Sequence, residues 1–116
     1  MMLQTNLEHI TSVEGFEKVL ADNENVMICC GRMGPMCLPV YDIMEALEGE
    51  YPSVAFRDMA FDSPVGMQTI RSLPQTQGFM GLPFTVYFKN GEVVAATSSI
   101  QSMDQVTAIL DANFAQ

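Results

Sequence analysis

The chain alternates short apolar runs with stretches in which apolar residues recur at helical spacing. Val26–Cys30 has no polar position, which is typical of a central strand buried on both faces. Asn90-Gly91 lies between two apolar runs and predicts a tight antiparallel hairpin. The pattern therefore predicts strands at Leu7–Ile10, Val26–Cys30, Val54–Phe56, Thr85–Lys89 and Glu92–Thr97.

The first two predicted helices lie on either side of the central strand. Thr11–Glu14 reads as a capping box, with the Thr11 hydroxyl at the N-cap and a carboxylate three residues later. The second helix is predicted over Cys37–Leu47. Pro39 is expected to kink this helix, because a proline inside a helix removes a backbone hydrogen bond.

The last two predicted helices follow the third strand and the hairpin. Asp62-Ser63-Pro64 opens a helix that is expected to run through Ile70, and a loop from Leu73 to Pro83 follows it. Ser102–Gln105 is a second capping box and opens the final helix. The order βαβαβαββα predicts an α/β fold in one domain, residues 1–116, with a mixed sheet of about five strands between four helices.

Charge and hydropathy exclude two classes of partner. The net charge is −9, from 14 acidic and 5 basic residues, so binding to a phosphate backbone is not expected. No apolar run approaches the roughly 20 residues that span a membrane. Met1–Ile10 lacks the basic and apolar regions of a signal peptide, so a cytoplasmic location is expected.

Sulfur gathers around one predicted turn. Met33-Gly34-Pro35-Met36 places two thioethers around a Gly-Pro pair, and a thioether neither ionises nor forms a disulfide. Met33, Met36, Cys37 and Met80 are soft donors that suit Cu(I). Methionine at this spacing is more typical of packing, so neither a metal nor a cofactor is predicted.

The three cysteines, Cys29, Cys30 and Cys37, lie within nine positions. An odd count argues against a disulfide framework. Cys37 opens a predicted helix beside Arg32, and both features stabilise a thiolate. One hypothesis is therefore a catalytic pair of Cys37 with Cys29 or Cys30. The alternative is that all three are small buried apolar residues.

Other polar residues are interpreted as surface groups. His9 is expected to be a solvated surface histidine rather than a catalytic base. Asp58 and Asp62 are expected to belong to an ordinary solvated loop, and the alternative is an acidic rim to the site.

From Leu7 to Phe114 the chain resembles the thioredoxin family. The resemblance rests on the strand, Gly-Pro turn and helix around Met33–Met36, on Gly81–Thr85, and on Phe88–Val93 with Leu110–Asn113. It implies that Pro83 is in the cis form and that the backbone of Leu82 pairs with an extended substrate segment.

The chain departs from the family at the positions that carry its chemistry. Met33 and Met36 replace both redox cysteines, and Arg32 replaces the preceding tryptophan. Met27 aligns with the family's buried acid, and Phe56 with its lysine partner. Parity places Cys29 on the same strand face as Met27, so the resemblance favours Cys29 over Cys30 as the partner of Cys37.

Two functions follow from the resemblance. The first is thiol–disulfide exchange with protein substrates, in which an exposed Cys37 attacks a target disulfide, Cys29 or Cys30 resolves it, and a thioredoxin-reductase-like enzyme is a partner. The alternative is a redox-inert module. There, Met33, Gly34, Pro35 and Met36 form an apolar groove with Leu82 and Pro83, and the groove binds an extended peptide or a partner protein.

Overall fold

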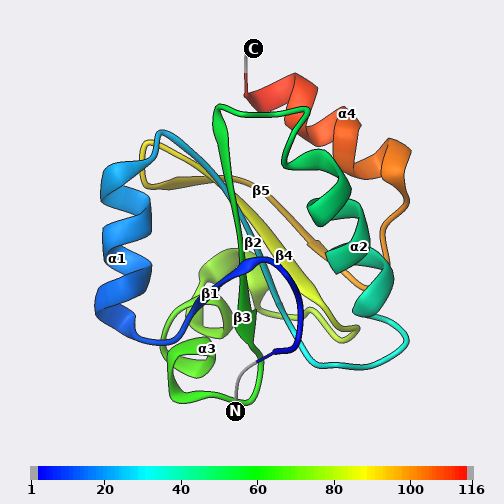
Figure 1. The fold of residues 1–116 in the computed structure, drawn as a ribbon. Helices are drawn as coiled ribbons and strands as arrows, with labels where there is room; N and C mark the ends of the chain where they lie inside the picture. The colour runs from blue at the N-terminus through cyan, green and yellow to red at the C-terminus, as the bar shows by residue number, and fades with distance from the viewer. Residues whose placement is uncertain (1–2, 115–116) are drawn as a thin grey trace.

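The structure is a computed structural model that describes residues 3–114. Its five strands form one sheet in the order β1-β3-β2-β4-β5, in which β1, β3 and β2 are parallel and the β4–β5 hairpin is antiparallel (Figure 1). The strands are β1 (Glu8–Ile10), β2 (Asn25–Gly31), β3 (Val54–Ala60), β4 (Phe84–Lys89) and β5 (Glu92–Ser98). The helices are α1 (Val13–Asp22), α2 (Leu38–Leu47), α3 (Pro64–Gln68) and α4 (Met103–Asn113), with short 3-10 turns η1 (Ile70–Ser72) and η2 (Pro74–Thr76).

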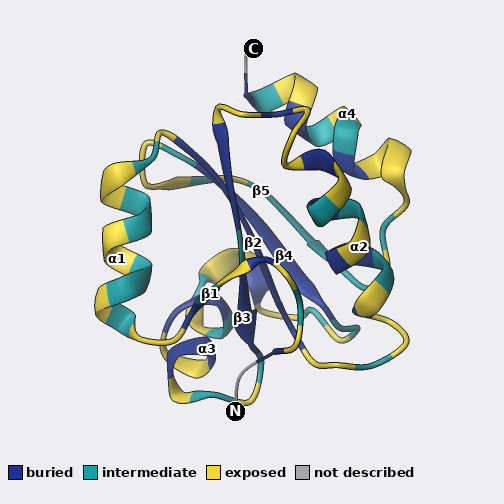
Figure 2. Cartoon of the chain, viewed as in Figure 1, coloured by how far each residue is buried: buried dark blue, intermediate teal, exposed yellow. Residues whose placement is uncertain are grey.

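The sheet is the middle layer of three. α2 and α4 pack on one face, and α1 and α3 pack on the other (Figure 1). Each face has its own apolar cluster, and together the two clusters bury β2 completely (Figure 2). The central position predicted for this strand is therefore confirmed.

The alternation of side chains along β2 decides which face each cysteine occupies. Met27 and Cys29 belong to the cluster under α2 and α4. Cys30 belongs to the cluster under α1 and α3, because successive strand residues point to opposite faces. Met27 pairs in register with Phe56, so apolar side chains fill the sheet beneath α2 at both positions.

The hairpin and the last helix agree with the prediction. Asn90 and Gly91 both have positive φ, at 52° and 81°, as a two-residue hairpin turn requires. Ser102 Oγ accepts the Gln105 N–H, and the Gln105 side chain accepts the Ser102 N–H. The predicted capping box is thus present in α4.

Two predictions at helix starts are wrong. The N-cap of α1 is Ser12 rather than Thr11, and its hydroxyl accepts the Gly15 N–H at 2.9 Å. Pro39 lies in the first turn of α2, not in the middle of the helix. The first N–H groups of a helix have no partner within the helix, so a proline there removes no hydrogen bond and needs no kink.

The third strand and third helix also differ from the prediction. β3 continues past Phe56 to Ala60, because residues 57–59 pair with both β1 and β2 and Ala60 pairs with β2. α3 ends at Gln68 instead of Ile70, and η1 and η2 follow it. No helix within residues 3–114 has the length and apolar character needed to cross a membrane.

Candidate functional site

The turn between β2 and α2 presents its methionines to solvent. Met33 and Met36 are 41% and 46% exposed, and Pro35 is exposed between them. The Gly34 carbonyl accepts the N–H groups of Cys37 and Leu38, each at 3.0 Å, so the turn leads directly into the helix. The two thioethers therefore form part of the outer surface of the turn.

The loop before β4 lies against this turn. Its Leu82–Pro83 peptide bond is cis. A Cβ added to Gly31 at the end of β2 would lie 2.8 Å from Cys37 Sγ and 3.0 Å from Pro83 Cβ. The strand end, Cys37 and Pro83 consequently meet at one point, and only glycine fits there.

Ser99 is hydrogen-bonded to the same loop. Its N–H lies 3.0 Å from the Gly81 carbonyl and 3.1 Å from the Pro83 carbonyl, so both carbonyls that bracket the cis bond accept from one donor. Ser99 has a φ of 69°, in the left-handed region that a serine seldom adopts. Pro83 is buried and Leu82 is half-buried against the core, which fixes the loop on its inner side.

Cys37 is buried, so its expected exposure is wrong. Only 2% of the residue is accessible. It is the N-cap of α2, and its side chain turns inward to the end of β2, where Sγ accepts the Arg32 N–H at 3.4 Å. Proximity to the helix start therefore does not bring this sulfur to the surface.

Cys29 shares the α2–α4 cluster with Cys37, whereas the sheet separates Cys30 from both. Burial raises the pKa of the Cys29 thiol well above its usual value, and the Thr85 hydroxyl near Sγ opposes this only in part. Burial also raises the pKa of Cys30, to about 12. All three cysteines are free thiols.

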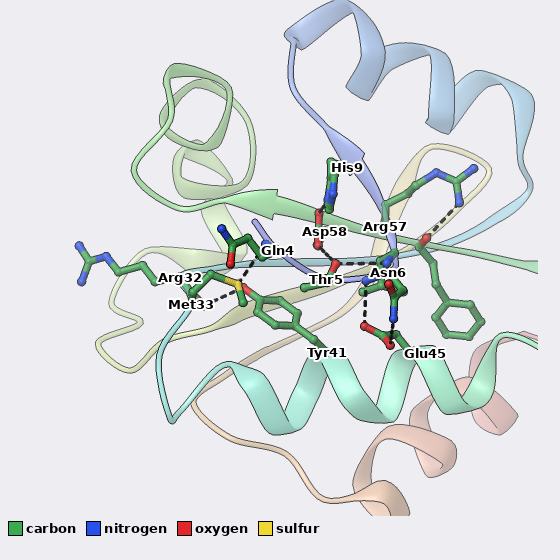
Figure 3. A network of polar contacts seen from close by, with 12 residues as sticks. Gln4, Thr5, Asn6, His9, Arg32, Met33, Tyr41, Glu45, Arg57 and Asp58 are labelled. Atoms are coloured by element: carbon green, nitrogen blue, oxygen red, sulfur yellow. Dashed lines mark hydrogen bonds and ion pairs between the residues drawn. The ribbon is translucent and has the colours of Figure 1, made fainter. Parts of the chain in front are cut away.

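Asp58 is buried rather than solvated, and His9 is only 20% exposed at its side chain, so both surface predictions are wrong. His9 Nδ1 lies 2.5 Å from one carboxylate oxygen of Asp58, and the Thr5 hydroxyl donates to the other (Figure 3). Burial raises the pKa of Asp58, and the hydrogen bonds from Thr5 and His9 oppose that rise. The pairing results from the register of β1 with β3, where His9 and Asp58 are direct neighbours.

The segment before β1 connects this pair to the methionine turn. The Gln4 N–H lies 3.3 Å from Met33 Sδ, and the Asn6 backbone and side chain donate to Glu45 on α2 (Figure 3). The sequence offered no signal for these contacts, because they depend on an irregular segment.

Arg32 forms a two-point ion pair with Asp62. The two nitrogen–oxygen distances are 2.6 and 2.8 Å, and about half of each side chain is exposed. The Arg32 guanidinium holds the pKa of Asp62 below its usual range. The expectation of a solvent-accessible Asp62 is met, and its charge is paired.

Within residues 3–114, no three His, Cys, Asp or Glu side chains gather closely enough to hold an ion. Met80 is 95% exposed and Cys37 is buried, so the sulfur atoms considered for Cu(I) occupy different environments.

No family model matches the sequence, and no curated protein matches it. Solved structures of thioredoxins do match the fold.

Plasmodium falciparum thioredoxin has a TM-score of 0.75 at 16% identity, over 92% of this chain and 99% of that one. Malassezia sympodialis thioredoxin has a TM-score of 0.73 at 17% identity, over 97% and 94% of the two chains. Arabidopsis thaliana thioredoxin O2 has a TM-score of 0.72 at 13% identity, over 98% and 99%. The order of the sheet, the two helix layers and these matches agree, and the chain has the thioredoxin fold.

Proposed function

We propose that this protein binds an extended peptide segment of a partner protein and does not exchange thiols. The peptide lies along the Leu82–Pro83 loop, and the exposed side chains of Met33 and Met36 contact its apolar residues. Backbone groups at Leu82 would supply main-chain hydrogen bonds, as in other modes of strand-like recognition. Methionine suits such a surface because its flexible thioether adapts to different partners.

The observation that carries this proposal is the burial of all three thiols beside a surface of exposed thioethers. A thiolate is the nucleophile in exchange, and burial disfavours the thiolates of Cys29 and Cys30. Only 2% of Cys37 is accessible, so its sulfur is not open to attack on a target disulfide in this structure. The exposed sulfur at Met33 and Met36 cannot take over, since a thioether forms no disulfide.

A titration with peptides tests the binding. The probe is a pool of blocked pentapeptides built from Ala, Val, Leu and Phe, added to isotope-labelled protein and followed by amide chemical shifts. We expect shifts at residues 33–36 and 81–82, and weaker binding in Met36→Glu. Met67→Glu is the matched control, because Met67 is similarly exposed at 55% but lies on α3. Shifts elsewhere, or no saturable shifts, would refute the proposal.

Thiol exchange is the second candidate, and one observation favours it: Cys29 and Cys37 lie in the same cluster beneath the turn. The Cys37 thiolate would attack a target disulfide and release one target thiolate. The Cys29 thiolate would then attack the mixed disulfide, release the second target thiolate and leave a Cys29–Cys37 disulfide, so that two electrons pass to the target.

An insulin-reduction assay with dithiothreitol separates the two candidates. Peptide binding alone predicts no acceleration over dithiothreitol, and slow labelling of all three thiols until the protein unfolds. Acceleration that disappears in Cys37→Ser and in Cys29→Ser, but persists in Cys30→Ser, would establish exchange and refute the first proposal.

A further inference from the structure

Arg71 stands apart from the other basic side chains. In a chain with 14 acidic and 5 basic residues, a guanidinium is expected to find a carboxylate. The other four basic residues do so, in the pairs Lys18–Asp22, Arg32–Asp62, Arg57–Glu8 and Lys89–Glu24. Among residues 3–114, no carboxylate lies within 4.0 Å of the Arg71 guanidinium.

The Arg71 side chain is nonetheless held in one place. Its guanidinium carbon lies 4.0 Å from the centroid of the Phe61 ring, and Nη1 donates to the Phe61 carbonyl at 3.1 Å. The Gln77 side chain donates to the Arg71 carbonyl at 3.0 Å, which fixes the backbone. A guanidinium has five N–H donors. The Arg71 guanidinium is therefore already positioned before a ligand binds, and several of its N–H groups remain free to donate to that ligand.

The same guanidinium lines a groove that begins at the proposed peptide site. The groove has a volume of about 350 Å³, and its walls include Leu82, Arg71 and Met80. The exposed lining is mostly polar, and three aromatic rings supply its apolar part, the floor: Phe84 lies edge-on to Phe61 at 5.2 Å and to Phe79 at 5.4 Å. One wall thus carries a positive charge and the floor suits an apolar side chain.

The overall charge limits what can bind there. A net charge of −9 repels a strongly acidic ligand at long range. The second cation at the groove, Arg32, is paired directly with Asp62, and Arg71 acts on the same carboxylate only from beyond 4.0 Å, where its charge helps to lower the pKa of Asp62. One unpaired guanidinium next to an apolar floor fits one carboxylate flanked by apolar residues, and a planar fork binds a carboxylate through two parallel hydrogen bonds.

We propose that Arg71 selects partners by binding a single Asp or Glu carboxylate in the captured peptide, while neighbouring apolar side chains occupy the groove floored by Phe61, Phe79 and Phe84. This inference rests on the proposed function, because the peptide that places the carboxylate here is the one that lies along Leu82–Pro83. It adds the chemistry that the partner has to carry.

Two pools of blocked pentapeptides test the selection. Both have Ala, Val, Leu or Phe at the outer positions, and the central residue is Asp in one pool and its uncharged isostere Asn in the other. Amide shifts of the labelled protein report the affinity and the place of binding. We expect the Asp pool to bind about tenfold more tightly, the size of a charge-assisted hydrogen bond.

The variants assign that preference to a residue. Arg71→Gln should bring the ratio of the two affinities to about one, and Arg71→Lys should retain part of the preference for the Asp pool. Arg57→Gln is the matched control, because Arg57 also donates Nη1 to a carbonyl of its own strand but lies outside the groove. Chemical denaturation of each variant shows whether it has kept its fold.

The outcomes separate this inference from the function on which it rests. Equal binding of the two pools at residues 81–82 would overturn the role of Arg71 and leave peptide binding intact. A preference that survives in Arg71→Gln, or that is lost equally in Arg57→Gln, would also overturn it. Failure of both pools to bind would refute the proposed function as well. Sodium acetate that binds as tightly as the Asp pool would overturn recognition of a peptide-borne carboxylate.

Discussion

His9 and Asp58 form a pair across two parallel strands, with Nδ1 and a carboxylate oxygen 2.5 Å apart. The carboxylate is fully buried and the Thr5 hydroxyl donates to its other oxygen. Thr5 binds Asp58, and its neighbour Gln4 donates its N–H to Met33 Sδ. The His9–Asp58 pair therefore helps to hold the N-terminal segment against the methionine turn. This buried polar cluster has a structural role, although its residues look like surface residues in the sequence.

Replacing Asp58 should destabilise the fold far more than replacing the exposed Asp62. Asp58→Ala leaves His9 and Thr5 without their buried partner, and we expect a loss of about 3 kcal/mol in the free energy of unfolding. Asp62→Ala breaks an exposed pair, for which about 0.5 kcal/mol is expected. Urea denaturation at pH 7 measures both. Similar losses for the two variants would contradict the role given to Asp58.

The free energy of unfolding should depend on pH through the titration of Asp58. Burial raises its pKa in the folded state, so the folded protein holds this proton more firmly than the unfolded chain does. The resulting stabilisation is complete below the unfolded value of about 3.9 and is lost as pH rises through the folded value. Relative to Asp58→Asn, the wild type should therefore be more stable at pH 3 than at pH 7. Urea denaturation of both proteins across this range measures the difference, and a difference that grows with pH would show the opposite sign.

Substitutions at Gly81 and Ser99 should compensate each other in their effects on the free energy of unfolding. A Cβ on Gly81 would lie 1.9 Å from Ser99 Oγ and 3.1 Å from Ser99 Cβ, so that Gly81→Ala should cost about 1 kcal/mol through overpacking even when the hydroxyl rotates away. Ser99→Gly removes the obstructing side chain, and glycine suits the φ of 69°. The double variant should therefore recover most of the loss in denaturation experiments. Gly49→Ala is the control, since nothing lies within 4 Å of its added Cβ. A double variant no more stable than Gly81→Ala would contradict this packing.

Peroxide should distinguish surface methionines from core methionines. Met36 and Met80 are exposed, whereas Met27, Met44 and Met59 are fully buried. Oxidation needs contact between peroxide and the thioether, so the exposed pair should form sulfoxides first, and the buried three only on unfolding. Peptide mass mapping during a time course provides the measurement. Oxidation of Met27 as fast as that of Met80 would contradict the arrangement of the core.

The elements with strong local signals could be predicted from the sequence. β2 was recognisable because its residues Val26–Cys30 include no polar position, and the hairpin because only a few residue types adopt the φ values of Asn90 and Gly91. The order of elements then fixed the layers of the fold. The capping box of α4 was equally clear, since Ser102 and Gln105 satisfy each other's backbone groups.

The site depended on contacts that a local pattern does not encode. Arg57-Asp58 resembles the end of a strand, but pairing with β1 on one side extends β3 through both charges. Cys37 resembled an exposed helix-start thiol, but the small Gly31 lets its sulfur turn into the sheet. That Arg71 has no direct ion pair among residues 3–114 becomes clear only when the partners of the other four basic residues are known.

Ser99 anchors both carbonyls around the Leu82–Pro83 bond through its single backbone N–H. In the preceding segment, Gln77, Gly78 and Met80 instead contribute to a wall of the groove. Protein engineers could therefore randomise that wall to create binders for new targets while the backbone edge that aligns the peptide stays in place.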